Sequence, residues 1–419
     1  MKFKRASHGN IVTGLDIGTT SIKAVVAKYE SDRAEVLGVV EMPSAGLRNG
    51  AVVEIPEAAQ AIRKVFIELE KIDKSARKNV FANIGSAQVK TQSSKGIVAV
   101  SSADNQIYQS DMDRVVRASQ AVNLSQNRKI IHTLIKEFIV DGMGDIDDPV
   151  GLSGSRLEVQ SLILDVFSPH ISALEHAVEL ADGQLGGLLF SPLVAARGTL
   201  SKKQKELGTA VIDIGFGTTG LAVYEENKLV FATKFPVGSD HISRDIAVGL
   251  KIPVEAAESI KIHYGFAVSK EVNAKDSLEL RKFIPDAKGS VSLRFISEII
   301  ESRLEEIFDF VNNELRNAGK YGNLPGGVVI VGGGSKLPNL TDLAKQELKL
   351  SSQIGCSIVN EWENEGGKYK SQIEDPEFVS AFGLALWGIY GEKSSQVKLK
   401  DPSLIDIKGF KKIIRYFTP

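Results

Sequence analysis

The chain contains two versions of one motif, Asp16-Ile17-Gly18-Thr19-Thr20 and Asp213-Ile214-Gly215-Phe216-Gly217-Thr218-Thr219. Each begins with an aspartate near the end of an apolar run and continues into glycine and a pair of threonines. A single copy would be equally typical of an ordinary β-hairpin turn. Two copies in matching surroundings indicate an internal duplication. We therefore expect two similar α/β lobes with a cleft between them.

The surroundings of the two motifs do match. Strand patterns cover Ile11–Ile17, Lys23–Tyr29 and Val36–Glu41, and again Ala210–Ile214, Gly220–Tyr224 and Lys228–Thr233. Apolar residues recur at helical spacing behind Pro56, a residue suited to the first turn of a helix, at Ala58, Ala61, Ile62, Val65, Phe66 and Leu69. The repeated unit is therefore a run of three strands, followed in the first copy by a helix.

The residue types of the motif suit phosphate binding. Glycines let backbone N–H groups approach a phosphate, threonine hydroxyls add donors, and a lysine that points into the cleft adds positive charge. The two aspartates would hold Mg²⁺ through its waters, because Mg²⁺ dehydrates reluctantly. Two facing loops of this kind could clamp the β- and γ-phosphates of a nucleotide. The candidate residues are Asp16, Gly18, Thr19, Thr20, Lys23, Asp213, Gly215, Gly217, Thr218 and Thr219.

A third motif lies near the C-terminal end, at Val328-Val329-Ile330-Val331-Gly332-Gly333-Gly334-Ser335. It predicts a buried strand that ends in three glycines, followed by a helix over Leu340–Leu348. A flat group such as adenosine could lie against this bare backbone. The alternative is a simple tight connection, but the joint occurrence of all three motifs in this order favours a nucleotide site.

A different pattern interrupts the first repeat over residues 85–165. Strands are expected near Ile97–Val100 and Leu157–Leu164, a helix over Asp111–Val122, and a loop over Asp141–Gly154. This pattern predicts an inserted α+β subdomain. After the second repeat, apolar residues keep helical spacing over Leu293–Leu315, which predicts a long amphipathic helix.

Composition bounds the function classes. With 43% hydrophobic and 25% charged residues, 419 residues should form a globular protein of two or three domains, or one bilobed body. The net charge of −1 does not indicate a nucleic-acid partner. Cys356 is the single cysteine, which excludes an intrachain disulfide and favours a reducing compartment. No segment is apolar for the roughly 18 residues of a spanning helix, and we expect a cytoplasmic protein.

The last twelve residues, Lys408–Pro419, differ from the rest of the chain. They carry four cations and no acid, and their apolar residues fall at i, i+3, i+4 and i+7. A polar linker, 391–407, precedes them. This pattern predicts an amphipathic helix that binds an anionic membrane surface, with docking on the protein's own body as the alternative. The residues that would face the membrane are Phe410, Lys411, Lys412, Ile413, Ile414, Arg415 and Phe417.

The three loops together resemble the signature of the actin superfamily, and within it the chain most resembles the FtsA family of bacterial cell-division proteins. Further similar stretches are Gly50–Ile55, Ser110–Val115, Asp148–Glu158 and Lys205–Gly208. The resemblance implies an actin-like two-lobed duplicated fold in which residues 85–165 form the 1C subdomain. Subdomain 1A would comprise 1–84, 166–197 and 375–390, subdomain 2A would comprise 198–245 and 325–374, and subdomain 2B would be 246–324.

The resemblance also implies roles for particular residues. ATP with Mg²⁺ would occupy the cleft, with adenosine bound by Gly238, Glu258, Lys261, Gly332, Gly333, Gly334 and Lys336. Ser239 and Ser243 depart from a glycine and a threonine that are usual in the family, and Gly220 stands where many superfamily members have an aspartate. Ser191 stands where relatives place a carboxylate or amide that orients the attacking water, so we expect slow or negligible ATP hydrolysis.

As a member of such a family, the protein would polymerise and anchor FtsZ filaments to the inner face of the cytoplasmic membrane at the division septum. The family binds the C-terminal tail of FtsZ in subdomain 2B, where Arg294, Glu298 and Arg303 are the candidates. Other division proteins would bind the 1C subdomain. The alternatives are an actin-like pilus-assembly adaptor and a small-molecule kinase of the same superfamily.

Overall fold

The computed structural model describes residues 11–30, 33–285, 289–363 and 367–391. The polar segment from 392 onward and the tail Lys408–Pro419, with all of its predicted membrane-facing residues, lie outside this part of the chain. No helix among the described residues is long and apolar enough to cross a membrane.

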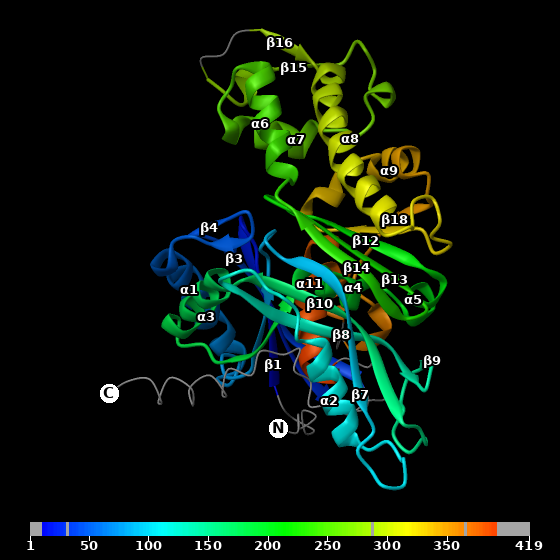
Figure 1. Cartoon of the computed structure of the whole chain (residues 1–419). Coiled ribbons are helices and arrows are strands. Elements are labelled where there is room, and N and C mark those ends of the chain that lie inside the picture. Colours follow the sequence, from blue (N-terminus) through cyan, green and yellow to red (C-terminus); the bar gives the residue numbers. More distant parts are fainter. Residues whose placement is uncertain (1–10, 31–32, 286–288, 364–366, 392–419) are drawn as a thin grey trace.

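Lobe 1 is built on a six-stranded sheet in the order β11-β6-β1-β2-β3-β19. Neighbours β1, β2 and β3 are antiparallel, whereas β6 and β11 add to the sheet in parallel. The strands are β1 (Ile11–Ile17), β2 (Ser21–Glu30), β3 (Arg33–Pro43), β6 (Val80–Ile84), β11 (Leu185–Phe190) and β19 (Trp362–Glu363). Helices α1 (Ile55–Ile72) and α3 (Ser168–Leu180) pack against each other beside this sheet (Figure 1).

Lobe 2 repeats the same plan on a five-stranded sheet in the order β14-β13-β12-β17-β18. Its strands are β12 (Thr209–Ile214), β13 (Thr219–Glu225), β14 (Lys228–Phe235), β17 (Val328–Val331) and β18 (Ser352–Ile354). As in lobe 1, the first three strands are antiparallel and the next is parallel to the first. The two predicted runs of three strands are therefore confirmed, and each places its aspartate near the end of its first strand.

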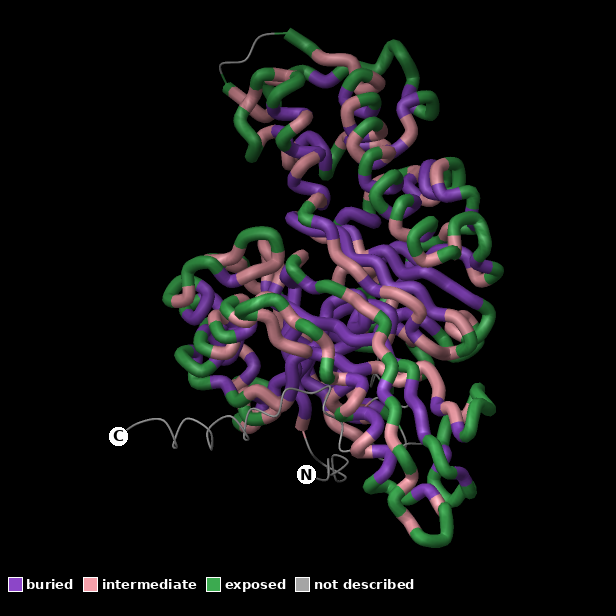
Figure 2. The backbone as a smooth tube through the Cα atoms, in the orientation of Figure 1, coloured by how far each residue is buried: buried purple, intermediate pink, exposed green. Residues whose placement is uncertain are grey.

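Two helices join the lobes at their centre. Helix α4 (Ser191–Thr199) packs on β12, β13 and β14, and α11 (Val379–Tyr390) packs on β1, β2 and β6. The two helices also pack on each other, so one buried core runs from sheet to sheet (Figure 2). The short helix α5 (Lys202–Leu207) leads from α4 into lobe 2.

A helical cap stands on lobe 2, at the top of Figure 1. It contains α6 (Ser239–Leu250), α7 (Val254–Tyr264) and α8 (Leu293–Asn317), with a small hairpin of β15 (Ser277–Glu279) and β16 (Ser290–Ser292). Helix α8 confirms the long amphipathic helix, and its apolar stripe is buried in the core of lobe 2. Helix α9 (Leu340–Leu348) has the predicted bounds.

The inserted segment forms its own sheet at the bottom right of Figure 1, in the order β7-β10-β8-β9. Its elements are β7 (Lys90–Ala99), α2 (Gln109–Ser119), β8 (Arg128–Val140), β9 (Met143–Ile146) and β10 (Arg156–Phe167). Helix α2 covers this sheet over a separate small core. The insertion is thus an α+β unit, as its pattern predicted.

Two expectations for the insertion were wrong in detail. Helix α2 begins earlier and ends earlier than Asp111–Val122, because the side chain of Asp111 caps the first turn at Tyr108 and the last turn closes at Gln120. The stretch 141–154 is not all loop, since β9 lies within it and pairs with β8. Strand β8 went unpredicted, because its mixed polar sequence conceals its alternation. The division into subdomains 1A, 1C, 2A and 2B stays a prediction.

Candidate functional site

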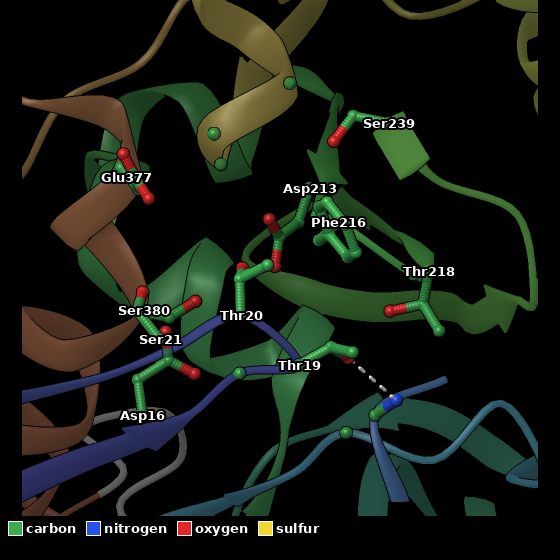
Figure 3. A pocket seen from close by; sticks show the side chains of 18 of the residues that line it. Asp16, Thr19, Thr20, Ser21, Asp213, Phe216, Thr218, Ser239, Glu377 and Ser380 are labelled. Atoms are coloured by element: carbon green, nitrogen blue, oxygen red, sulfur yellow. Dashed lines mark hydrogen bonds between the residues drawn. The ribbon is translucent and has the colours of Figure 1, made fainter. Parts of the chain in front are cut away.

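A cavity of about 440 Å³ lies between the lobes, and both copies of the duplicated motif line it. Figure 3 shows Thr19 and Thr20 of lobe 1 near Asp213 and Thr218 of lobe 2. The glycines after β17 line it as well. The predicted residues that the structure brings together here are Asp16, Gly18, Thr19, Thr20, Lys23, Asp213, Gly215, Gly217, Thr218, Glu258, Lys261, Gly332, Gly333, Gly334 and Lys336. Its size is typical of a small-molecule site.

The lobe 1 loop is a tight turn between β1 and β2. The Gly18 N–H donates to the Ser21 carbonyl over 3.1 Å, and the Thr19 hydroxyl accepts from the Gly50 N–H over 3.3 Å (Figure 3). The equivalent turn of lobe 2 is closed by the Gly215 N–H and the Thr218 carbonyl at 3.0 Å. The two loops therefore have the same internal hydrogen bond.

The start of α6 braces the lobe 2 loop. The N–H groups of Ser239 and Asp240 donate to the carbonyls of Gly215 and Phe216 over 2.9 and 2.8 Å. A Cβ on Gly238 would lie 2.5 Å from the Phe216 oxygen, so only glycine allows the chain to pass so close to the loop. Gly238 does not line the cavity but packs behind the loop, so its contact with adenosine stays a prediction.

Thr219 also does not line the cavity. It opens strand β13 and is fully buried, opposite Ile214 of the lobe 2 core. Thr218, in the turn directly before this strand, does line the cavity. The role of Thr219 as a phosphate donor therefore stays a prediction, for a side chain that lies outside the cavity lining.

The two aspartates occupy one end of the cavity. Burial raises the pKa of Asp16 to about 6, with Lys23 lowering it and Asp213 raising it further. Burial likewise raises the pKa of Asp213. The Asn83 amide donates to Asp16 Oδ1 over 2.5 Å while its carbonyl accepts from the Ile17 N–H, so Asn83 fixes the position of the Asp16 carboxylate.

This donor set fits Mg²⁺. Two carboxylates and nearby hydroxyls are hard oxygen ligands, and a divalent cation would relieve the repulsion between the carboxylates. No group of three or more His, Cys, Asp or Glu residues in the described ranges could form a metal site by itself. Such a site suits an ion that is held mainly by waters and phosphate oxygens.

Helix α7 and the glycine loop also line the cavity. Lys261 Nζ lies 2.8 Å from Glu258 Oε2 and donates to the Ser239 carbonyl over 3.0 Å, and the Ser243 hydroxyl also donates to Glu258. Ser243 therefore keeps a hydroxyl role despite its departure from threonine. Gly332 has φ +86°, and a Cβ there would lie 2.4 Å from Asp213 Oδ1. The glycine loop thus runs against the lobe 2 aspartate.

Glu377 links the lobes across the cavity. It lies on the 3-10 turn η6 (Pro376–Phe378), and its carboxylate is 2.8 Å from both Lys23 Nζ of lobe 1 and Lys336 Nζ of lobe 2. Burial alone would lower the pKa of Lys23, but the ion pair with Glu377 outweighs it and the pKa is raised. Lys23 thus faces the cavity as predicted, with its charge already paired.

Sequence reasoning missed Asn83, Lys234 and Glu377, all of which line the cavity. Asn83 had a usable signal, since it is a polar residue in the middle of the fully buried strand β6. Lys234 and Glu377 had none, because a charged residue near the end of a strand or helix is usually solvated.

Ser191 lines the cavity at the first residue of α4. Its hydroxyl donates to the Ile84 carbonyl over 3.0 Å and accepts from the Asn83 amide over 3.4 Å. A hydroxyl held in this way is no base for activating water.

The FtsZ-tail candidates lie on α8, away from the cavity. Glu298 and Arg303 line a hollow with Asp245, Phe295, Ile299, Ser302 and Glu306. Arg303 forms a bidentate ion pair with Asp245, in which Nε and Nη2 donate to Oδ2 and Oδ1 over 2.6 and 3.0 Å. Arg294 does not line the hollow, since its guanidinium donates to the Val272 carbonyl.

Comparison with known proteins gives the family. The model for "Cell division protein FtsA" matches residues 210–383, and the model for the SHS2 domain inserted in FtsA matches residues 86–164. Cell division protein FtsA of Bacillus subtilis is 32% identical over 378 residues, which cover 90% of this chain and 83% of that protein. The chain belongs to the FtsA family. FtsA of Borreliella burgdorferi is 30% identical over 96% of this chain and 98% of its own length.

Solved structures confirm the predicted actin-like fold of this FtsA-family chain. The PilM–PilN type IV pilus biogenesis complex contains a chain that matches 90% of this one at TM-score 0.66 and 18% identity, with 98% of that chain covered. MreB5 of Spiroplasma citri bound to ADP matches 98% of this chain and 99% of its own at TM-score 0.54 and 14% identity. These likenesses concern the fold alone. The chain is accordingly an actin-like cell-division protein with an inserted α+β domain.

Proposed function

We propose that this protein binds ATP with Mg²⁺ in the cavity between its lobes, polymerises, and anchors FtsZ filaments to the cytoplasmic membrane during cell division. The observation that carries the proposal is the facing pair of phosphate loops at Asp16 and Asp213, which line one cavity in an FtsA-family chain. MreB5 of Spiroplasma citri, which has the same fold, binds ADP in its crystal structure.

The roles of the chain's own residues follow from their positions. The loop N–H groups and the hydroxyls of Thr19, Thr20 and Thr218 would bind the β- and γ-phosphates. Asp16 and Asp213 would hold the waters of Mg²⁺, which supplies positive charge against the phosphates. Glu258 and Lys261 would contact the nucleoside at the other end of the cavity.

Equilibrium binding of fluorescent ATP to the full chain tests the cleft. Asp213→Asn should weaken binding in Mg²⁺ by at least about tenfold, because it removes one anchor of the metal. Asp182→Asn is the matched control, since Asp182 is exposed and does not line the cavity. If the unaltered protein fails to bind ATP at millimolar concentration, nucleotide binding is wrong.

Nucleotide would act structurally, because Ser191 offers no base for hydrolysis. We expect the rate of phosphate release to be far below that of a cycling chaperone ATPase. We also expect filaments to form on lipid in the presence of ATP, without hydrolysis of the nucleotide. Phosphate release at chaperone-like rates would contradict this part. Electron microscopy of lipid monolayers with ATP or ADP tests polymerisation.

Membrane attachment is proposed for the tail Lys408–Pro419, on its sequence pattern. Removal of Gly409–Pro419 should abolish co-sedimentation with anionic liposomes. A control variant in which Lys411, Lys412 and Arg415 become Gln separates the electrostatic from the apolar contribution. It keeps the apolar stripe and should retain weaker binding that depends less on salt. Full sedimentation of the truncated protein would contradict the assignment.

FtsZ binding is proposed for the hollow along α8 that contains Glu298 and Arg303. Phe295→Ala should weaken binding of an FtsZ C-terminal peptide, because Phe295 is 44% exposed there and offers apolar area. Phe310→Ala on the same helix is the control, because Phe310 stacks on Phe235 outside the hollow. Equal loss in both variants would indicate helix damage and contradict the site.

A further inference from the structure

Four lysines line the nucleotide cavity, and they differ in what neutralises them. Lys23 lies 2.8 Å from Glu377, Lys261 lies 2.8 Å from Glu258, and Lys336 lies 2.7 Å from Asp375. Among the residues that the structure describes, no carboxylate lies within ion-pair distance of Lys234 Nζ. Lys234 is therefore the cavity lysine whose charge is left for a ligand.

The sheet register explains why Lys234 faces the cavity. Asp213 on β12 is directly opposite Gly220 on β13, and Gly220 is directly opposite Lys234 on β14. Directly opposed residues project from the same face of a sheet, so these three positions form one row on the cavity side. Gly220 adds no side chain to this row, and Pro192 of α4 packs over it, since a Cβ on Gly220 would lie 3.0 Å from Pro192 Cγ. Lys234 and Asp213 are two strand spacings apart, roughly 10 Å.

The surroundings of Lys234 are costly for a cation without a partner. Burial lowers the pKa of Lys234, and the more distant Asp213 and Asp16 only partly oppose this effect. A phosphate oxygen at the aspartate end of the cavity would satisfy the ammonium group with a charge-assisted hydrogen bond.

We propose that Lys234 is a phosphate ligand contributed by lobe 2, which binds the terminal phosphate of the nucleotide and makes binding selective for triphosphate over diphosphate. This inference rests on the proposed nucleotide function and assigns a further residue to that site. Lys234 and the lobe 2 loop then hold the phosphates from one side, and the lobe 1 loop holds them from the other.

A second consequence concerns the metal. In EDTA, Asp16 and Asp213 repel the terminal phosphate, and the lysines of the cavity must supply the neutralising charge. Lys234 should therefore matter more without Mg²⁺ than with it. Its loss should convert binding that tolerates EDTA into binding that needs the metal.

The test is the affinity of the full chain for ATP and ADP, each in Mg²⁺ and in EDTA, by competition with a fluorescent nucleotide. Lys234→Met should weaken ATP binding about tenfold in Mg²⁺ and more in EDTA, and change ADP binding less than about threefold. Lys234→Arg keeps the charge and should recover much of the loss. Lys228→Met on the same strand is the control, since Lys228 does not line the cavity and pairs with Asp147 at 3.3 Å.

The outcomes separate this inference from the function on which it rests. If the unaltered protein binds ATP but Lys234→Met binds ATP as tightly, or loses ATP and ADP equally while still folded, the role of Lys234 is overturned. If the unaltered protein binds no nucleotide, the proposed function fails first. Thermal melting of each variant without nucleotide establishes that it is folded.

Discussion

The two lobes place the same aspartate on the same strand, but they differ in the residues beside it. In lobe 1 the row across three strands is Asp16, Lys23 and Glu41, whereas in lobe 2 it is Asp213, Gly220 and Lys234. The lysine of the row lies on the second strand, β2, in lobe 1 and on the third strand, β14, in lobe 2. Lys23 is paired with Glu41 and Glu377, whereas Lys234 lacks such a partner among the described residues.

This difference teaches that the duplicated loops are equivalent in shape but not in charge. Through Glu377, Lys23 connects lobe 1 to Lys336 of lobe 2, so its charge serves the contact between the lobes. The charge of Lys234 serves a ligand instead. Matched substitutions in the two rows test this difference in the roles of the two lysines.

The largest expected effect separates the two lysines in the absence of nucleotide. Lys23→Met should lower the free energy of unfolding by about 3 kcal/mol, because it leaves the partly buried Glu377 and the exposed Glu41 with one partner fewer. Lys234→Met should change it by less than about 1 kcal/mol, since it breaks no ion pair. Urea unfolding measures both. Equal losses would mean that the two rows are alike in charge.

The next effect compares the turns themselves. A Cβ on Gly18 would lie 2.7 Å from the Ser21 oxygen, whereas a Cβ on Gly215 would lie 3.1 Å from the Thr218 oxygen. Gly18→Ala should therefore destabilise the protein by about 2 kcal/mol and Gly215→Ala by about 1 kcal/mol or less. Thermal melting gives the order, and a reversed order would show that the lobe 1 turn is the more adaptable one.

A pH series addresses Asp16, whose pKa in the folded protein is about 6. Because this pKa is raised above the ordinary 3.8, the folded state holds the proton more tightly than the unfolded state. The contribution of Asp16 to stability is full below about pH 4 and is lost as the pH rises to about 6. Asp16→Asn should remove this loss and stabilise the nucleotide-free protein at pH 7 by about 1 kcal/mol, after allowance for the partial exposure of Asp16.

Urea unfolding between pH 4 and pH 7 measures the Asp16 effect. Asp182→Asn, at an exposed site outside the cavity, should keep the pH dependence of the unaltered protein. If the stability of Asp16→Asn depends on pH as strongly as that of the control, Asp16 is not the source of the pH dependence.

The smallest effect concerns the inserted domain, which contacts the edge strand of lobe 2. Thr91 donates to the Ala232 carbonyl of β14, and Lys228 at the start of β14 lies 3.3 Å from Asp147. Because Asp147 is 72% exposed, Lys228→Met should change stability by less than about 0.5 kcal/mol. A larger loss in urea unfolding would mean that the insertion supports lobe 2 through this contact.

The sequence alone determined the duplicated strands, the three loops and the long helix. Their signals are local: an aspartate after an apolar run, glycine beside threonine, and apolar residues at helical spacing. Strand β8 was not predicted because its polar and apolar side chains do not alternate cleanly. Strand β9 was not predicted because four residues inside a polar stretch are too few to show a periodic pattern.

Only the tertiary structure decided which members of the motifs face the cavity. Thr218 and Thr219 are neighbours of one type, but Thr218 lines the cavity whereas Thr219 begins β13 and is fully buried. The positions of Gly238 and Glu377 depend on packing between segments that are far apart in sequence. Strand register likewise decides which residue lies opposite each lysine, Glu41 for Lys23 and Gly220 for Lys234. Lys23 and Lys234 look alike in sequence, and the fold alone gives one of them its carboxylates and leaves the other for a ligand.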